Sequence, residues 1–107
     1  MSTLESLMGH IAAVWVCDPE RYPALAGMDD AQRRMFLVKH SLLHVSKTVG
    51  KVAAVCEDFD HAGVKGAESA AALQDGVVKL FVNALKLAEE TGLSAEDLLR
   101  RAPEFVK

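Results

Sequence analysis

The chain has 107 residues, of which half are hydrophobic and a quarter are charged. That length suits a single domain, and so large an apolar fraction excludes intrinsic disorder. The net charge is −3 at pH 7, and the basic doublets are limited to Arg33-Arg34 and Arg100-Arg101. This pattern argues against nucleic-acid binding. We therefore expect one folded domain over residues 1–107.

No membrane span or secretion signal is expected. The longest apolar run is residues 11–17, whereas a helix needs about 20 apolar residues to cross a bilayer. The first residues lack the basic region of a secretory signal. Cys17 and Cys56 both lie in helical apolar patterns and are too few for a disulfide framework. We therefore expect a cytoplasmic protein with reduced, buried cysteines.

The first predicted helix covers about residues 3–17. Its apolar residues recur at helical spacing at Leu4, Met8, Ile11 and Trp15. Ser2 and Glu5 have the spacing of a capping box, and Asp18-Pro19 ends the helix. Pro23 and Gly27 predict an irregular segment after it, which Tyr22 and Leu25 anchor to the core.

The second predicted helix, about residues 30–61, has the strongest pattern in the chain. Its apolar residues alternate at steps of three and four without a miss: Met35, Val38, Leu42, Val45, Val49, Val52, Cys56 and Phe59. Asp29 or Asp30 can cap its start, and Gly63 can form a left-handed cap at its end. This narrow seam predicts contact with a partner helix.

The third predicted helix covers about residues 67–91, and a short fourth helix covers about 94–102. Gly92 fits a cap after the third helix, Ser94 starts the fourth, and Pro103 breaks it. No strand pattern competes. The predicted fold class is therefore all-α, a helical bundle built on a long antiparallel hairpin of the second and third helices. A wide apolar stripe on the third helix predicts a homodimer or higher homo-oligomer.

The two long helices and the sequence Gly-Leu-Ser-Ala-Glu-Asp-Leu-Leu at 92–99 resemble the MazG-like all-α nucleotide pyrophosphohydrolases. Members of that family carry Glu-Glu-x-x-Glu on one helix and Glu-x-x-Asp on the next. These carboxylates hold Mg²⁺ against a triphosphate while water attacks it. The similarity covers about residues 35–99. It aligns the first motif with Lys-Thr-Val-Gly-Lys at 47–51 and the second with Gly-Val-Val-Lys at 76–79.

None of the family's metal-binding carboxylates is present at these positions. They are replaced by Lys47, Thr48, Lys51, Gly76 and Lys79. Mg²⁺ prefers oxygen ligands, and ammonium groups repel it. The resemblance therefore implies a degenerate relative with no catalytic residue and no cofactor. We expect a non-catalytic module that binds a small anionic ligand or a protein partner.

Three lysines form a candidate anion-binding site. In an antiparallel hairpin with its loop near Gly63, Lys79 falls between the levels of Lys47 and Lys51. Three like charges at one level favour a compensating anion, such as a nucleotide or another phosphate-containing molecule. The alternative is three solvated lysines, with Asp75 neutralising part of the charge within its own helix.

His40 and His44 form a candidate site for a transition metal. Two histidines one helical turn apart bind zinc or iron in many helical proteins, and the third helix offers Glu89 or Glu90 as a further ligand. We expect both histidines to lie on the side of the second helix opposite its apolar seam. The alternative is one buried histidine hydrogen-bonded to a carbonyl and one solvated histidine.

An acidic cluster at the end of the second helix is a candidate Mg²⁺ site. It contains Glu57, Asp58, Asp60 and His61, and Glu68 or Asp75 lies close enough in the sequence to join it. A cation there would allow a divergent nucleoside triphosphate pyrophosphohydrolase, with the lysines binding phosphate. The alternative is a solvated turn.

Overall fold

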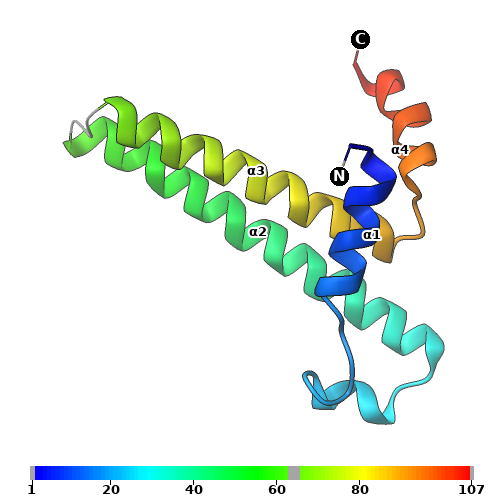
Figure 1. Cartoon of the computed structure of the whole chain (residues 1–107). Coiled ribbons are helices and arrows are strands. Elements are labelled where there is room, and N and C mark those ends of the chain that lie inside the picture. Colours follow the sequence, from blue (N-terminus) through cyan, green and yellow to red (C-terminus); the bar gives the residue numbers. More distant parts are fainter. Residues whose placement is uncertain (1, 63–65, 107) are drawn as a thin grey trace.

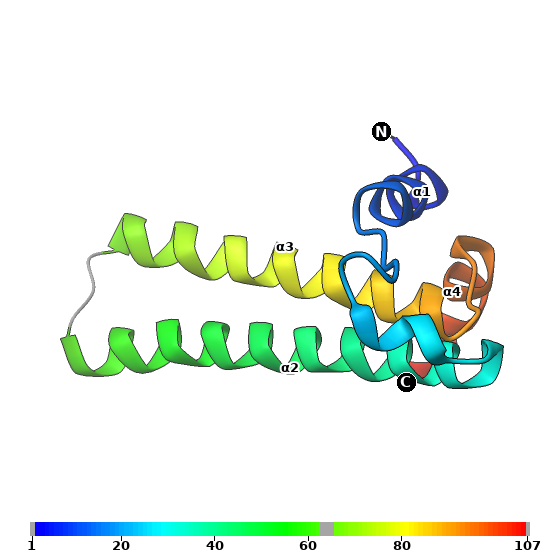
Figure 2. The same cartoon turned by 90° about the horizontal axis from the view of Figure 1, so that it is seen from below.

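The computed structural model describes residues 2–62 and 66–106, and over these residues it contains helices and no strand. The helices are α1 (Leu4–Val14), α2 (Asp30–Ala62), α3 (Gly66–Glu90) and α4 (Ala95–Arg101). Two 3₁₀ turns, η1 (Pro23–Gly27) and η2 (Ala102–Phe105), complete the order. α2 and α3 lie side by side along their length (Figures 1 and 2). The all-α hairpin architecture predicted from the sequence is confirmed.

The predicted start and end of the first helix are both corrected. Thr3, not Ser2, caps α1, because its side-chain oxygen accepts a hydrogen bond from the Ser6 amide at 3.0 Å. α1 ends at Val14 rather than Cys17, since Trp15 leaves the helical conformation with φ −94° and ψ 67°. The chain therefore turns away from α1 before Cys17.

The other helix ends follow the sequence signals more closely. Asp29 caps α2 reciprocally with Gln32, through bonds of 2.8 and 3.0 Å. Gly92 has a φ of +88° and ends α3 in a Schellman motif, in which the Leu93 amide bonds the Ala88 carbonyl. Ser94 and Asp97 form a capping box for α4. The cap expected at Gly63 lies outside the described residues.

Two contacts fix the register of the hairpin. A β-carbon added to Gly76 of α3 would come within 2.7 Å of Val52 Cγ2 on α2, so the two helices approach closely there. About two turns further along α3, Asn83 Nδ2 donates to Thr48 Oγ1 of α2 at 3.1 Å. The face of α2 that meets α3 therefore runs through Thr48 and Val52.

That face corrects the predicted seam of α2. Val38, Val45 and Val52 are half-buried, but the other members of the seam are exposed: Met35, Leu42, Val49, Cys56 and Phe59. The close approach at Gly76 turns Thr48 toward α3, and this orientation leaves five of the eight seam residues exposed. Cys56 is therefore exposed rather than buried, whereas Cys17 is half-buried; neither forms a disulfide.

The core sits at one end of the hairpin. Met8 and Ile11 of α1 pack against Leu85 of α3 and Ala95 of α4. The segment after α1 covers the start of α2, where Leu25 is fully buried. α1 and α4 gather at this end of the hairpin and leave the other half uncovered (Figure 1).

The molecule is extended for its mass. Its radius of gyration is 16.6 Å, against about 13 Å for a compact domain of this length. Its accessible surface is 7773 Å², against about 5,800 Å² for a compact monomer of equal mass. No helix among the described residues is long and apolar enough to cross a bilayer.

Candidate functional site

A cavity of about 270 Å³ opens between the segment after α1 and the hairpin. We call it the interhelical cavity. The segment after α1 contributes Trp15, Cys17, Arg21 and Tyr22 to its lining. The helices contribute His40, Ser41 and His44 from α2, and Asn83 and Lys86 from α3. The lining thus combines aromatic rings with polar and cationic groups.

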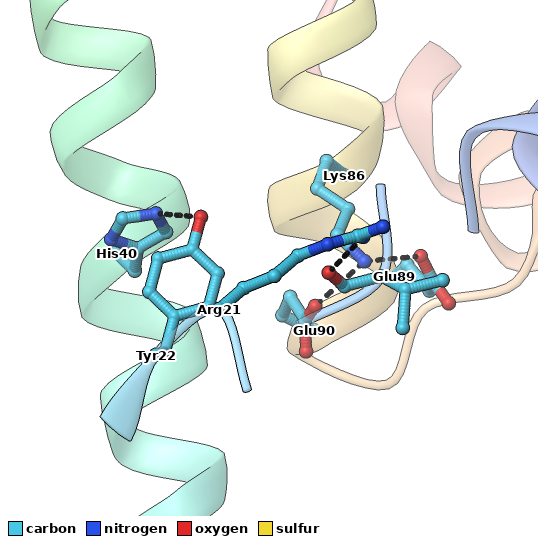
Figure 3. A network of polar contacts seen from close by, with 7 residues as sticks. Arg21, Tyr22, His40, Lys86, Glu89 and Glu90 are labelled. Carbon is cyan, nitrogen blue, oxygen red and sulfur yellow. Dashed lines mark hydrogen bonds and ion pairs between the residues drawn. The ribbon is translucent and has the colours of Figure 1, made fainter. Parts of the chain in front are cut away.

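Two histidines and a tyrosine meet on one wall of the cavity. His40 Nε2 lies 3.0 Å from the Tyr22 hydroxyl and 3.1 Å from His44 Nε2. The His40 ring also stacks on Phe36, with 6.0 Å between ring centroids. His40 is half-buried and His44 is exposed. The segment before η1 therefore brings Tyr22 to His40 (Figure 3), and the period of α2 places His44 one turn further along the helix.

The electrostatics of this wall favour a neutral His40. Burial and the neighbouring His44 both lower the pKa of the His40 imidazole from its ordinary value. The contact with Tyr22 agrees in part with the alternative predicted from the sequence, in which a hydrogen bond holds one of the two histidines. The partner of His40 is the side-chain hydroxyl of Tyr22, however, and not a backbone carbonyl. The pair also flanks the face that meets α3 and does not lie opposite it.

Asn83 links the two long helices beside this wall. Its Nδ2 donates to Thr48 Oγ1 at 3.1 Å and to the Lys79 carbonyl at 2.8 Å. The Thr48 hydroxyl in turn donates to the His44 carbonyl at 2.9 Å. These bonds fix Asn83 between α2 and α3 and place the backbone of Lys79 within a turn of the cavity.

Lys86 is one of the two cationic side chains that line the cavity, together with Arg21. Its Nζ pairs with Glu90 at 2.9 Å and with Glu89 at 3.4 Å. Burial opposes its charge, but the hydrogen bond and charge of Glu90, aided by Glu89, outweigh burial and raise the pKa of Lys86. Figure 3 shows the three side chains grouped at the end of α3. Glu89 and Glu90, considered above as metal ligands, are therefore engaged with Lys86.

Cys17 and Arg21 complete the rim of the cavity. Burial raises the pKa of the Cys17 thiol, and the nearby Lys86 charge only partly opposes this effect. The thiol is thus kept protonated and weakly nucleophilic. Arg21 Nη1 donates to the Val16 carbonyl at 3.0 Å, which holds the segment after α1 in its turn.

The three lysines of the predicted anion site are all exposed. Lys47 follows His44 by three residues and Lys51 follows Lys47 by four, so they continue the histidine side of α2. Lys79 precedes Asn83 by four residues on α3 and continues its side in the same way. Within the described part of the chain, no hydrogen bond or ion pair involves the three ammonium groups.

The acidic cluster at the end of α2 is solvent-exposed. Glu57, Asp58 and Asp60 are all exposed, and Glu57 lies 3.9 Å from His61 Nε2. The Glu68 side chain lies outside what the structure describes, and Asp75 is exposed on α3. Among the residues described, no three histidine, cysteine or acidic side chains converge in a manner that would hold a metal.

Several residues of the cavity had no functional role in the sequence interpretation. Lys86 carried no motif, and Tyr22 was expected only to anchor its segment. Ser41 is 6% exposed and lines the cavity, although its position on α2 gave no sign of this. Their meeting depends on how the segment after α1 folds back over the hairpin, which a helical period does not encode.

Comparisons with protein-family models, with curated proteins and with solved structures found no match to the chain.

Proposed function

We propose that this chain is a non-catalytic, MazG-like helical module that binds a small phosphate-containing anion. The anion would lie along the lysine side of the hairpin and extend to the interhelical cavity. The observation that carries the proposal is the packing of Gly76 against Val52, considered together with the exposed lysines at the neighbouring motif positions.

The contact at Gly76 supports the loss of metal-dependent catalysis. The resemblance aligns this position with the first glutamate of the second motif. A β-carbon there would already lie 2.7 Å from Val52 Cγ2, so a carboxylate side chain at this position would have to displace Val52. Thr48, aligned with another glutamate, uses its hydroxyl to bond Asn83 and His44. Two of the five aligned positions, Gly76 and Thr48, therefore serve the packing of α2 against α3.

The lysines supply the charge that an anion needs. Lys86 is neutralised by two glutamates, so it contributes little net attraction to the cavity. Lys47, Lys51 and Lys79 are exposed and continue the sides of α2 and α3 on which His44 and Asn83 line the cavity. Clustered ammonium groups raise the local concentration of anions and bind phosphate as point charges. Trp15, 41% exposed at the cavity, offers a flat surface for an attached ring.

Titration calorimetry with pyrophosphate and with nucleoside triphosphates tests the proposal in the absence of Mg²⁺. We expect saturable binding that a triple variant, Lys47→Gln, Lys51→Gln and Lys79→Gln, weakens at least tenfold. Lys39→Gln is the matched control, because Lys39 is equally exposed but lies on another side of α2. Equal binding by the triple variant and the control would refute an anion site at these lysines.

A pyrophosphohydrolase is the competing function, and turnover separates it from the proposal. Pyrophosphate release from nucleoside triphosphates with Mg²⁺ should stay at the buffer rate. The Asp58→Asn variant, altered in the exposed acidic cluster, should behave identically. Mg²⁺-dependent release by the wild-type chain that Asp58→Asn abolishes would establish the enzyme instead.

We also propose that a second copy of the chain covers the exposed apolar side of the hairpin, which includes Val78 and Phe81 of α3. The accessible surface exceeds that of a compact monomer by about 1,900 Å², whereas a stable dimer needs about 800 Å² or more from each partner. Val78 and Phe81 of α3 are 60% and 49% exposed. Sedimentation should therefore give a dimer or larger, and Val78→Glu should shift it toward monomer. A wild-type monomer at high concentration would remove this part of the proposal.

A further inference from the structure

The His40 nitrogen faces more polar partners than it can bond. An imidazole Nε2 either donates one hydrogen bond or accepts one. His40 Nε2 nevertheless has the Tyr22 hydroxyl at 3.0 Å and His44 Nε2 at 3.1 Å. In a metal-free molecule only one of these contacts is a full hydrogen bond. The other brings two polar atoms together with little gain.

The two histidine nitrogens have the separation of ligands on a single metal ion. The ring centroids lie 4.7 Å apart, whereas the Nε2 atoms lie 3.1 Å apart, so the nitrogens occupy the space between the rings. Two ligands bound at about 2.0–2.1 Å in tetrahedral or octahedral geometry lie about 2.9–3.4 Å apart. One cation between the nitrogens would use both lone pairs and leave Tyr22 free to bond water.

The surroundings suit a transition metal better than Mg²⁺. Imidazole is a good ligand for zinc, cobalt and nickel, whereas Mg²⁺ requires oxygen ligands. Lys86, one of the two cations that line the cavity, is paired with Glu89 and Glu90, so its repulsion is largely cancelled. His44 is exposed and provides a route for the ion to enter.

We propose that His40 and His44 bind one divalent transition-metal ion of the zinc class through their Nε2 atoms, at the wall of the interhelical cavity. Water completes the coordination, since no third histidine, cysteine or acidic side chain converges there among the described residues. The open positions face the cavity, where a further ligand can reach the ion. The site does not depend on the lysines or on any anion.

Competition with a metallochromic dye measures Zn²⁺ binding on untagged, chelator-stripped protein. We expect one equivalent per chain, and His44→Gln should weaken binding at least tenfold. His44 is exposed, so this variant leaves the packing intact; unchanged circular dichroism checks that point. His61→Gln is the matched control, because it removes an equally exposed histidine from the same helix. Equal affinities in wild type and His44→Gln, or an equal loss in His61→Gln, would overturn the site.

Two further readouts identify the ligands. Nitrogen-edited NMR of the histidine rings should show Zn²⁺ shifting the Nε2 signals of His40 and His44 and leaving His61 in place. Binding should also weaken on acidification, because protons compete for the same lone pairs. The triple lysine variant should bind Zn²⁺ as wild type does, so failure of the anion site and failure of the metal site are distinguishable.

Discussion

Gly76 on α3 lies against Val52 on α2 so closely that a β-carbon at position 76 would be 2.7 Å from Val52 Cγ2. Real β-carbons do not approach other atoms to this distance, and valine is short and stiff at χ1. This contact therefore sets both the spacing of the hairpin and the side of α2 that meets α3.

Gly76→Ala should destabilise the protein by about 1–3 kcal/mol, because overpacking at the contact exceeds the gain in helix propensity. Denaturant unfolding measures the change. Gly50→Ala is the matched control: this glycine lies in α2 with no atom within 4 Å of an added β-carbon. It should gain up to about 1 kcal/mol. A similar gain from Gly76→Ala would show that the helices do not meet at Val52.

Thr48 and Asn83 should be energetically coupled across the hairpin. Thr48→Val keeps the shape of the side chain but removes the acceptor of the 3.1 Å hydrogen bond, and Asn83→Ala removes the donor. A double-mutant cycle should give a coupling of about 1 kcal/mol. Strict additivity of the two substitutions would contradict the bond between the helices.

Lys86→Met should lower the free energy of unfolding by about 2 kcal/mol near neutral pH. That figure lies between the values for exposed and buried ion pairs, because the Lys86 and Glu90 side chains are 12% and 13% exposed. Methionine keeps the apolar stem but leaves Glu90 unpaired. Urea unfolding of the two proteins measures the difference.

The same pair predicts a pH dependence. The folded-state pKa of Lys86 is raised above its ordinary value. Its contribution is therefore complete below about pH 10.4, the ordinary lysine value, and is lost as the pH rises through the folded-state pKa. The gap between wild type and Lys86→Met should accordingly shrink at strongly alkaline pH. A gap that stays constant there would place the stabilisation in packing alone.

The metal-free protein should lose stability on mild acidification. Because the His40 pKa is lowered in the folded state, the unfolded chain takes up a proton that folded His40 resists. The penalty is absent above about pH 6.5 and grows as the pH falls below that value. His44→Gln removes one cause of the lowered pKa, so its stability should fall less between pH 7.5 and 5.5. His61→Gln should keep the wild-type slope.

The periodic pattern of the sequence was sufficient for the hairpin. Apolar steps of three and four identify α2, and Gly92 and Ser94 mark the turn into α4 at the residues where the structure places it. These features are local, because capping and helical period depend on neighbours within a turn or two. The fold class and the helix order were therefore predictable.

The face of α2 that meets α3 could not be predicted from the apolar seam of α2. A helix with apolar residues on more than one side has several possible contact faces, and the choice depends on the partner. Here a small residue, Gly76, decides it, with Thr48 and Asn83 beside it. The exposed positions of Cys56 and Phe59 follow from that choice.

The histidine pair was predictable from its spacing, but its surroundings were not. Helical period alone places His40 and His44 on one side of α2. The contact with Tyr22 joins residues that are 18 positions apart, and it exists because η1 folds back over the start of α2. Tyr22 and Leu25 predicted that this segment packs on the core, and Leu25 is fully buried, but they did not indicate that Tyr22 reaches His40.

α1 and α4 pack against only one half of the hairpin. The two halves therefore differ in their free energy of local unfolding. Amide protons near Leu85, beneath α1, should exchange with solvent only on global unfolding, whereas those near Val55 and Leu73 exchange through smaller openings. Val78 and Phe81, which we propose a second copy covers, lie on another side of α3 than Lys79. Assembly and ligand binding can therefore be altered separately by substitution on different sides of the same helices.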